Sequence, residues 1–321
     1  MEDKLKNIGF YTLEDERARN VSFYSPLWRC ELLLTSHCNF NCVYCRGFRK
    51  EDQGDLSWDD AKRVIDLWCS DGLKNVRFSG GEPTLWKYLT KLVEYCNTNG
   101  VERIAISTNG SASLSLYKEL INAGVNDFSI SLDSCCSATV NKMAGNISVF
   151  DKIVYTIKEL SKLTYVTIGT VLVGDNENEI DEIIKYGMNL GVSDIRLITA
   201  AQRAKYLPSF DYVGNGFPIL KYRLNNMKHG KPIRGIGVDD NFRCPLVLDD
   251  MAILNGKHYP CIIYLREQGN AIGDVSARMR YGRLALYLSH NCYEDPICRN
   301  NCLDVCVDYN NRVREFGGGG S

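Results

Sequence analysis

Cys38-Asn39-Phe40-Asn41-Cys42-Val43-Tyr44-Cys45 is the stretch from which the organisation of the chain follows. Its three cysteines lie on a short loop directly after the apolar run of residues 30–35. Three thiolates at this spacing can bind three irons of a [4Fe–4S] cube and leave the fourth iron open. A zinc knuckle that lacks one ligand, or a set of free thiols, would use the same residues. The motifs that follow decide between these alternatives.

Strand-like and helix-like segments alternate downstream of this loop. Alternation of this kind indicates a parallel sheet with helices outside it, because parallel neighbours need crossover connections. Active residues of such sheets gather at the carboxyl ends of the strands. The predicted strands are 30–35, 75–79, 103–107, 127–133, 165–173 and 194–199, and the predicted helices are 58–69, 86–99, 114–123, 149–163 and 180–190.

Polar motifs end three of these strands. Gly80-Gly81-Glu82-Pro83 ends the second, Thr108-Asn109-Gly110 the third and Ser131-Leu132-Asp133 the fourth. Two residues without side chains let the backbone approach a ligand, and the glutamate carboxylate can face an ammonium group. Each motif alone is an ordinary turn, so the information lies in their order behind the cysteine loop.

In this order the motifs resemble those of the radical S-adenosylmethionine (radical SAM) enzymes over residues 30 to 200. The resemblance implies an α/β fold, a partial (β/α)6 TIM-like barrel, with a catalytic [4Fe–4S] cluster on Cys38, Cys42 and Cys45. It also implies that a flavodoxin or ferredoxin reduces the cluster and that an electron enters the sulfonium of bound SAM. A 5′-deoxyadenosyl radical then removes a hydrogen from the substrate.

The resemblance also assigns the residues around SAM. Tyr44 would lie beside the adenine, and the GGEP segment would bind the methionine amino group. Glu31 and Arg77 would point into the barrel mouth, which makes them candidates for substrate contact. The complete cofactor-binding set is Tyr44, Gly80, Gly81, Glu82, Pro83, Thr108, Asn109, Ser131 and Asp133.

Six further cysteines follow residue 243, the first two around Asn255-Gly256, the turn signal of a hairpin. Their spacing resembles the SPASM or twitch extension, which carries auxiliary [4Fe–4S] clusters. The pattern is incomplete, because Ser289 stands where its CxxCxxxxxCxxxC run begins and another cysteine is missing near Asp249 and Asp250. By position the resemblance assigns Cys244, Cys261 and Cys302 to one cluster and Cys292, Cys298 and Cys306 to another.

Each of these clusters would need a non-cysteine ligand or an open iron. One four-cysteine cluster with two spare thiols is the alternative, so the prediction is one or two auxiliary clusters. The expected organisation is an N-terminal extension at 1–28, a radical SAM core at 29–200, a bridging segment at 201–243, an auxiliary-cluster domain at 244–316 and a flexible linker at 317–321.

The charge balance gives no reason to expect a nucleic-acid or membrane partner. The chain has 38 Lys and Arg residues against 39 Asp and Glu, and no apolar run approaches the roughly 20 residues of a membrane span. We therefore expect a soluble cytoplasmic protein. Fourteen cysteines in that compartment point to metal or cluster binding rather than to disulfides.

The leading hypothesis is a radical SAM oxidoreductase that oxidises or cross-links a peptide or protein. The alternatives are a radical SAM enzyme that modifies a sugar, cyclitol or nucleoside, a non-catalytic iron–sulfur electron-transfer protein, and a zinc scaffold. Residues 131–145 also resemble the GTP 3′,8-cyclases. We do not expect GTP cyclisation, because Glu31 and Thr167 stand where that family has a substrate arginine and lysine.

Overall fold

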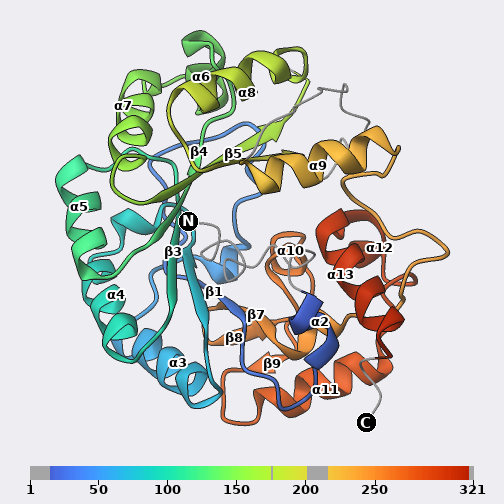
Figure 1. The fold of residues 1–321 in the computed structure, drawn as a ribbon. Coiled ribbons are helices and arrows are strands. Elements are labelled where there is room, and N and C mark those ends of the chain that lie inside the picture. The colour runs from blue at the N-terminus through green and yellow to red at the C-terminus, as the bar shows by residue number, and fades with distance from the viewer. Residues whose placement is uncertain (1–14, 175, 201–215, 318–321) are drawn as a thin grey trace.

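A computed structural model describes residues 15–174, 176–200 and 216–317. Its centre is a nine-stranded sheet in the order β6-β5-β4-β3-β2-β1-β7-β8-β9 (Figure 1). All neighbouring strands from β6 through β1 to β7 (Asp250–Leu254) are parallel, and β8 (Lys257–Tyr259) is antiparallel to both β7 and β9 (Gly273–Asp274). The parallel core strands are β1 (Arg29–Leu33), β2 (Asn75–Ser79), β3 (Arg103–Thr108), β4 (Asp127–Ser131), β5 (Tyr165–Leu172) and β6 (Asp194–Thr199).

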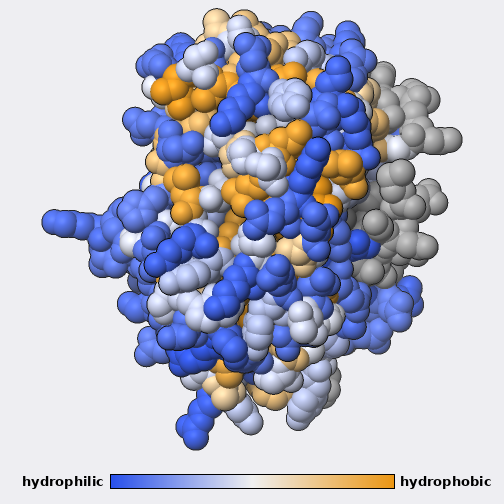
Figure 2. All heavy atoms as spheres, turned by 90° about the vertical axis from the view of Figure 1, so that its left-hand side faces the viewer, coloured by the Kyte–Doolittle hydropathy of each residue, from blue (hydrophilic) through white to orange (hydrophobic). Residues whose placement is uncertain are grey.

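Helices cover the outer side of these strands (Figure 1). The first, α3 (Trp58–Ser70), begins where the Ser57 hydroxyl accepts a hydrogen bond of 3.0 Å from the backbone N–H of Asp60. Figure 2 shows that the face these helices turn outward is mainly hydrophilic, with apolar side chains in small groups. Their apolar sides therefore pack on the sheet. The other covering helices are α4 (Leu89–Thr98), α5 (Leu114–Ala123), α7 (Phe150–Leu160) and α8 (Ile180–Asn189).

The predicted fold class is confirmed. The sheet ends at β6 on one side and at β9 on the other, so it is a partial barrel rather than a closed one. All six predicted core strands are present, two with the predicted ends and four with ends that differ by at most two residues.

The predicted C-terminal hairpin is also present, as β7 (Asp250–Leu254) and β8 (Lys257–Tyr259). Asn255 and Gly256 both have positive φ, at 47° and 73°, which is the geometry of a two-residue hairpin turn. Sequence analysis did not anticipate that β7 pairs in parallel with β1, so that the hairpin extends the core sheet.

Four helical segments differ from the sequence prediction, and one of them, predicted at 149–163, ends at Leu160. The helix predicted at 86–99 begins only at Leu89, after a 3₁₀ turn at Pro83–Leu85. The short helix α6 (Ser137–Met143) was not predicted, and α9 (Pro218–Lys228) lies inside the predicted bridging segment. The start of α9 is held by the carboxylate of Asp194, which accepts from the backbone N–H groups of Ile219 and Leu220. The cap comes from a distant strand, so the only local start signal is the proline at the first position of the helix, Pro218, which sequence analysis took as a mark of the bridging segment.

The C-terminal elements lie across the sheet from the covering helices (Figure 1). The N-terminal helix α2 (Asp15–Asn20) lies on the same side and packs against α13. Its Arg17 forms a buried ion pair of 2.5 Å with Asp249. The remaining elements are α10 (Ile262–Arg266), β9 (Gly273–Asp274), α11 (Met279–Ser289), α12 (Pro296–Asn301) and α13 (Asp304–Glu315).

Parts of four predicted segments lie outside the described residues, namely 1–14, 175, 201–215 and 318–321. The predicted domain boundaries stay a prediction. Among the helices that the structure describes, none has the length and apolar character needed to cross a bilayer.

Candidate active site and auxiliary metal centre

The loop after β1 places three thiols at the carboxyl edge of the sheet. Cys38 and Cys45 are exposed and Cys42 is half-buried. Backbone N–H groups point at two of the sulfurs, from Phe40 to Cys38 and from Gly47 to Cys45, each at 3.4 Å. Burial, followed by the nearby Asp133, Cys45 and Cys38, raises the pKa of Cys42 to about 12. A bound metal centre would instead lower the pKa of Cys42, because coordination deprotonates a thiol.

The two glycines of the GGEP segment pack directly on the backbone that leads into this loop. The Gly81 N–H donates to the Thr35 carbonyl at 2.7 Å, and the Glu82 N–H donates to the His37 carbonyl at 2.8 Å. A Cβ at Gly80 would lie 2.3 Å from the Thr35 carbonyl oxygen, and one at Gly81 would lie 2.1 Å from that of His37. Sequence analysis explained these glycines by the approach of a ligand, whereas in the structure they allow two chain segments to meet.

The carboxylate of Glu82 joins the ends of β2 and β3. One oxygen accepts from the N–H and hydroxyl of Thr84 and from the hydroxyl of Thr108, and the other accepts from the Asn109 N–H at 2.7 Å. Burial nevertheless raises the pKa of Glu82. The Asn109 amide reaches on to Asn39 at 2.9 Å and lies 4.0 Å from the Cys38 sulfur. The second and third strand ends therefore brace the cysteine loop.

The end of β4 also contacts the cysteine loop and helps to hold it in place. The Tyr44 hydroxyl donates to Asp133 at 2.6 Å, and the Val171 N–H donates to the other oxygen of the same carboxylate at 2.9 Å. Burial raises the pKa of Asp133 to about 6. Ser131, at the end of β4, is exposed beside them. The structure thus brings all the predicted SAM-binding motifs to one edge, and their individual assignments to SAM stay predictions.

The two predicted substrate residues are neighbours on the inner face of the sheet. Glu31 and Arg77 pair in the β1–β2 register. Glu31 accepts a hydrogen bond of 2.6 Å from Ser79, and Arg77 lies 3.4 Å from Asp127. Both charges are therefore partnered, as burial requires.

Sequence analysis missed two further arginines at this inner face. Arg196 on β6 donates to Ser129 at 3.1 Å, and burial, with nearby Arg77, lowers its pKa to about 10. Arg266 on α10 donates to the Gly80 carbonyl at 2.7 Å. The alternation of side chains along strand 194–199 could have identified Arg196. No local signal marks Arg266, because it reaches the site from the C-terminal part of the chain.

The six C-terminal cysteines line one cavity. Hydrogen bonding with Cys292 and burial raise the pKa of Cys244 well above its usual value, so these two thiols are neighbours. The resemblance to the SPASM pattern assigned Cys244 and Cys292 to different clusters. In the structure the cysteines of both predicted clusters line the same cavity. Near the missing ligand positions, Asp249 is held by Arg17, while Asp250 lines the cavity. The side chains of this cavity that are of metal-ligand type are Cys244, Cys261, Cys292, Cys298, Cys302, Cys306, His290 and Asp250, and the assignment of the six cysteines as cluster ligands stays a prediction.

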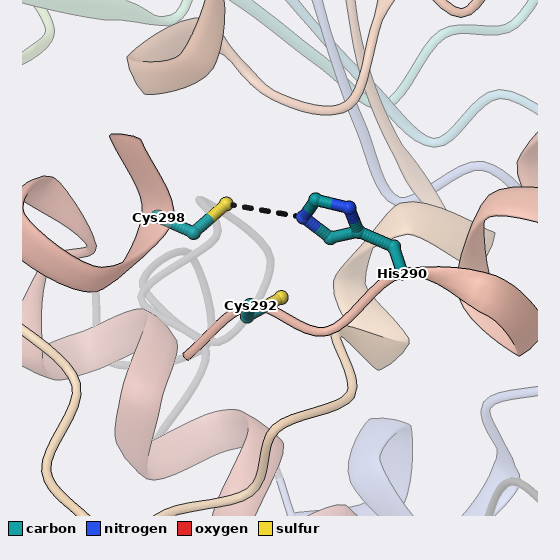
Figure 3. A group of neighbouring side chains, drawn as sticks. All are labelled: His290, Cys292 and Cys298. Atoms are coloured by element: carbon teal, nitrogen blue, oxygen red, sulfur yellow. Dashed lines mark hydrogen bonds between the residues drawn. The ribbon is translucent and has the colours of Figure 1, made fainter. Parts of the chain in front are cut away.

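One group of ligand atoms in this cavity is especially close. The Nε2 atom of His290 and the sulfurs of Cys292 and Cys298 all lie within 4.8 Å of one another (Figure 3). Sequence analysis did not single out His290. Its position directly after Ser289, where the extension pattern lacks a cysteine, was the available signal.

An open parallel barrel with three thiols on the loop after its first strand defines a radical SAM core. Residues 32–187 match the family model of the Radical SAM superfamily, and this part of the chain belongs to that superfamily. Its cofactors are a [4Fe–4S] cluster and SAM, and the three partly accessible thiols of Cys38, Cys42 and Cys45 fit the cluster.

Curated relatives carry the description probable GTP 3′,8-cyclase. The protein of Saccharolobus solfataricus is 32% identical over 181 residues, which are 55% of this chain and 58% of the relative. That of Pyrococcus abyssi is 29% identical over 167 residues, which are 51% of this chain and 54% of the relative. This chain therefore spans little more than half the length of these relatives.

Two solved structures share the fold over most of this chain. Streptococcus suis SuiB bound to its precursor peptide SuiA has a TM-score of 0.59 and 16% identity, covering 89% of this chain and 69% of SuiB. The enzyme anSMEcpe with bound AdoMet has a TM-score of 0.60 and 16% identity, covering 90% of this chain and 96% of that one. Both structural similarities extend well beyond residues 32–187. At 16% identity they show a shared fold.

Proposed function

We propose that this chain is a radical SAM enzyme that removes a hydrogen atom from a peptide or protein, which it thereby oxidises or cross-links. The observation that carries this proposal is the position of the three partly accessible thiols, beside a polar inner face and braced by Glu82, Asn109 and Asp133. When bound, the cluster and SAM supply the electron and the radical. A flavodoxin or ferredoxin is the proposed reductant.

The residues of the chain hold and orient these groups. The Glu82 oxygen that accepts the Asn109 N–H has a further lone pair that could accept from a second donor, such as the ammonium group of SAM. The hydrogen bond from Tyr44 to Asp133 holds in place the part of the loop that carries Cys45. Arg266 spans from the auxiliary part to the GGEP backbone, so it links the two parts at the active edge.

The peptide substrate is supported by the likeness to SuiB, solved with its precursor peptide SuiA, and to anSMEcpe, solved with a bound Kp18Cys peptide. A second candidate substrate is a small anionic molecule, such as a phosphorylated sugar or nucleoside. Three guanidinium groups, on Arg77, Arg196 and Arg266, favour it, since guanidinium groups bind phosphate and carboxylate well. The relatives described as GTP 3′,8-cyclases are consistent with this second candidate.

The first experiment is anaerobic reconstitution with iron and sulfide counting, followed by dithionite and SAM. A single cavity for six thiols predicts one auxiliary cluster, hence about eight irons per chain, and release of 5′-deoxyadenosine. About four irons would refute the auxiliary cluster. No 5′-deoxyadenosine with a full iron complement, a native reductant and substrate pools present would refute the enzymatic function, and zinc without sulfide would establish a scaffold.

Substrate class can be tested through deuterium transfer into 5′-deoxyadenosine. Deuterated peptides from the protein's own cell extract are compared with deuterated phosphorylated sugars and nucleosides. If the substrate is a small anion, Arg196→Gln should raise its KM while leaving the cluster's iron content unchanged. If it is a peptide, deuterium should come from the peptide pool alone.

A further inference from the structure

The cysteine cavity holds more thiols than one cluster takes. A [4Fe–4S] cluster bound only by cysteines takes four thiolates, and six thiols line the cavity. Two thiols are therefore left over for another use. In the part of the chain that the structure describes, Cys292 and Cys298 are the two that form a close group with a ligand of another type, the imidazole of His290 (Figure 3).

The spacing within this group is that of ligands on a single metal ion. The three ligand atoms all lie within 4.8 Å of one another, and Nε2 of His290 is 3.7 Å from the Cys298 sulfur. With a zinc–nitrogen bond of about 2.0–2.1 Å and a zinc–sulfur bond of about 2.3 Å, two such ligands of a tetrahedral zinc ion stand about 3.6 Å apart. Ligands on separate irons of a cube stand further apart, because two irons lie between them. The geometry therefore favours one ion.

The backbone holds each of the three ligands in place before any metal binds. His290 follows the last turn of α11, where the chain is extended at φ −82° and ψ 131°. The N–H of Cys292 donates to the Phe242 carbonyl at 2.9 Å, and the N–H of Cys298 donates to the Asp295 carboxylate at 3.0 Å. Cys292 is buried and the other two residues are half-buried. The group is therefore preorganised, as a metal site requires.

The neighbouring carboxylate is already engaged on both of its oxygens. One oxygen of Asp295 accepts from the N–H groups of Ile297 and Cys298. The other accepts from the Tyr264 hydroxyl at 2.8 Å and lies 3.6 Å from Nε2 of His290, beyond hydrogen-bond length. Asp295 thus fixes the start of α12 and leaves the imidazole nitrogen directed at the two thiols.

We propose that Nε2 of His290 and the thiolates of Cys292 and Cys298 bind one zinc ion, as a centre distinct from the auxiliary cluster. One imidazole and two thiolates are a donor set that zinc takes in proteins, with the fourth tetrahedral position left to water or to an outside ligand. The inference goes beyond the proposed function and rests on it only in leaving four thiols to one auxiliary cluster. Those four are Cys244, Cys261, Cys302 and Cys306.

The test counts zinc and iron in the same sample. The full-length enzyme, produced in zinc-containing medium and reconstituted anaerobically with iron and sulfide, should hold about one zinc and about eight irons per chain. X-ray absorption at the zinc edge reports the ligands of zinc alone, whatever the clusters hold. It should show two sulfur ligands and the outer-shell scattering of an imidazole.

Variants then separate a ligand from a merely structural histidine. His290→Ala should lose the zinc and keep the iron, and His290→Cys should keep the zinc with three sulfur ligands. His229→Ala is the matched control and should keep the zinc with its imidazole. His229 is exposed, and among the described residues its ring contacts only the Asn225 carbonyl of its own helix.

The outcomes distinguish this site from the proposed function. About eight irons without zinc, or about twelve irons, would overturn the zinc site and leave the enzymatic proposal intact. Zinc retained in His290→Ala would also overturn it. About four irons, together with zinc on one imidazole and two sulfurs, would support the zinc site and overturn the auxiliary cluster.

Discussion

Gly81→Ala tests whether close contact between two backbone segments positions the cysteine loop. The added Cβ would lie 2.1 Å from the His37 carbonyl oxygen and 2.7 Å from that of Ser36. Real Cβ atoms essentially never come closer than 3.0 Å to another heavy atom, so the first contact falls short by about 0.9 Å. Both obstacles are backbone atoms, and therefore the loop itself must move.

The expected effect follows from that displacement. Overpacking of this kind costs about 1–3 kcal/mol of stability. A shift of about 1 Å at reacting groups can lower a rate about 100-fold. We therefore expect Gly81→Ala to lower the rate of 5′-deoxyadenosine release by roughly two orders of magnitude, with auxiliary iron retained.

The assay compares anaerobic iron content, thermal unfolding and 5′-deoxyadenosine release for the variant and a control. Gly100→Ala is the control, because a Cβ there meets nothing within 4 Å and only its positive φ of 79° opposes the change. It should lose about 1 kcal/mol of stability and keep the normal rate. If Gly81→Ala releases 5′-deoxyadenosine as fast as the Gly100→Ala control, the packing argument is wrong.

Three further predictions concern the cluster, the carboxylate that joins the strand ends, and pH. Cys42→Ala should abolish reductive SAM cleavage and retain the auxiliary iron; activity in the reconstituted variant would contradict the cluster assignment. Glu82→Gln places an amide N–H2 against donors that need an acceptor, among them the Asn109 N–H, and should destabilise the protein by about 1–3 kcal/mol in urea unfolding. Burial and nearby Arg283 lower the pKa of His258 to about 4. The folded state therefore keeps His258 neutral, and stability should fall as pH drops from about 6.5 towards 4, by at most about 1.4 kcal/mol per pH unit. An unchanged pH profile in His258→Gln would show that another group is responsible.

The core of the fold was predictable because its signals are local. Apolar runs indicated the strands, and the helix predicted at 58–69 is present as α3. The failures share one physical cause. The cap of α9 comes from Asp194, and the arginine that reaches the GGEP backbone comes from α10. Interactions between segments far apart in the chain leave no local pattern.

The same distinction applies to the candidate site. The cysteine spacing and the strand-end motifs identified one edge of the sheet, and the structure brings these residues together there. The auxiliary ligands were harder, because a pattern of cysteines cannot indicate that the neighbouring residue, His290, faces the cavity. That depends on where α11 ends and how the backbone turns there.

The pairing of β7 with β1 has a consequence for anyone who exchanges C-terminal extensions between enzymes of this kind. Along Arg29 to Leu32, the edge of the strand that leads to the cysteine loop is covered by β7. A chain cut at residue 243 would leave that edge's N–H and C=O groups without their strand partner, and open edges of this type recruit other chains. The C-terminal extension therefore cannot be exchanged as an independent unit. An extension taken from another enzyme must supply a strand that pairs with β1, in addition to cysteines that bind a cluster.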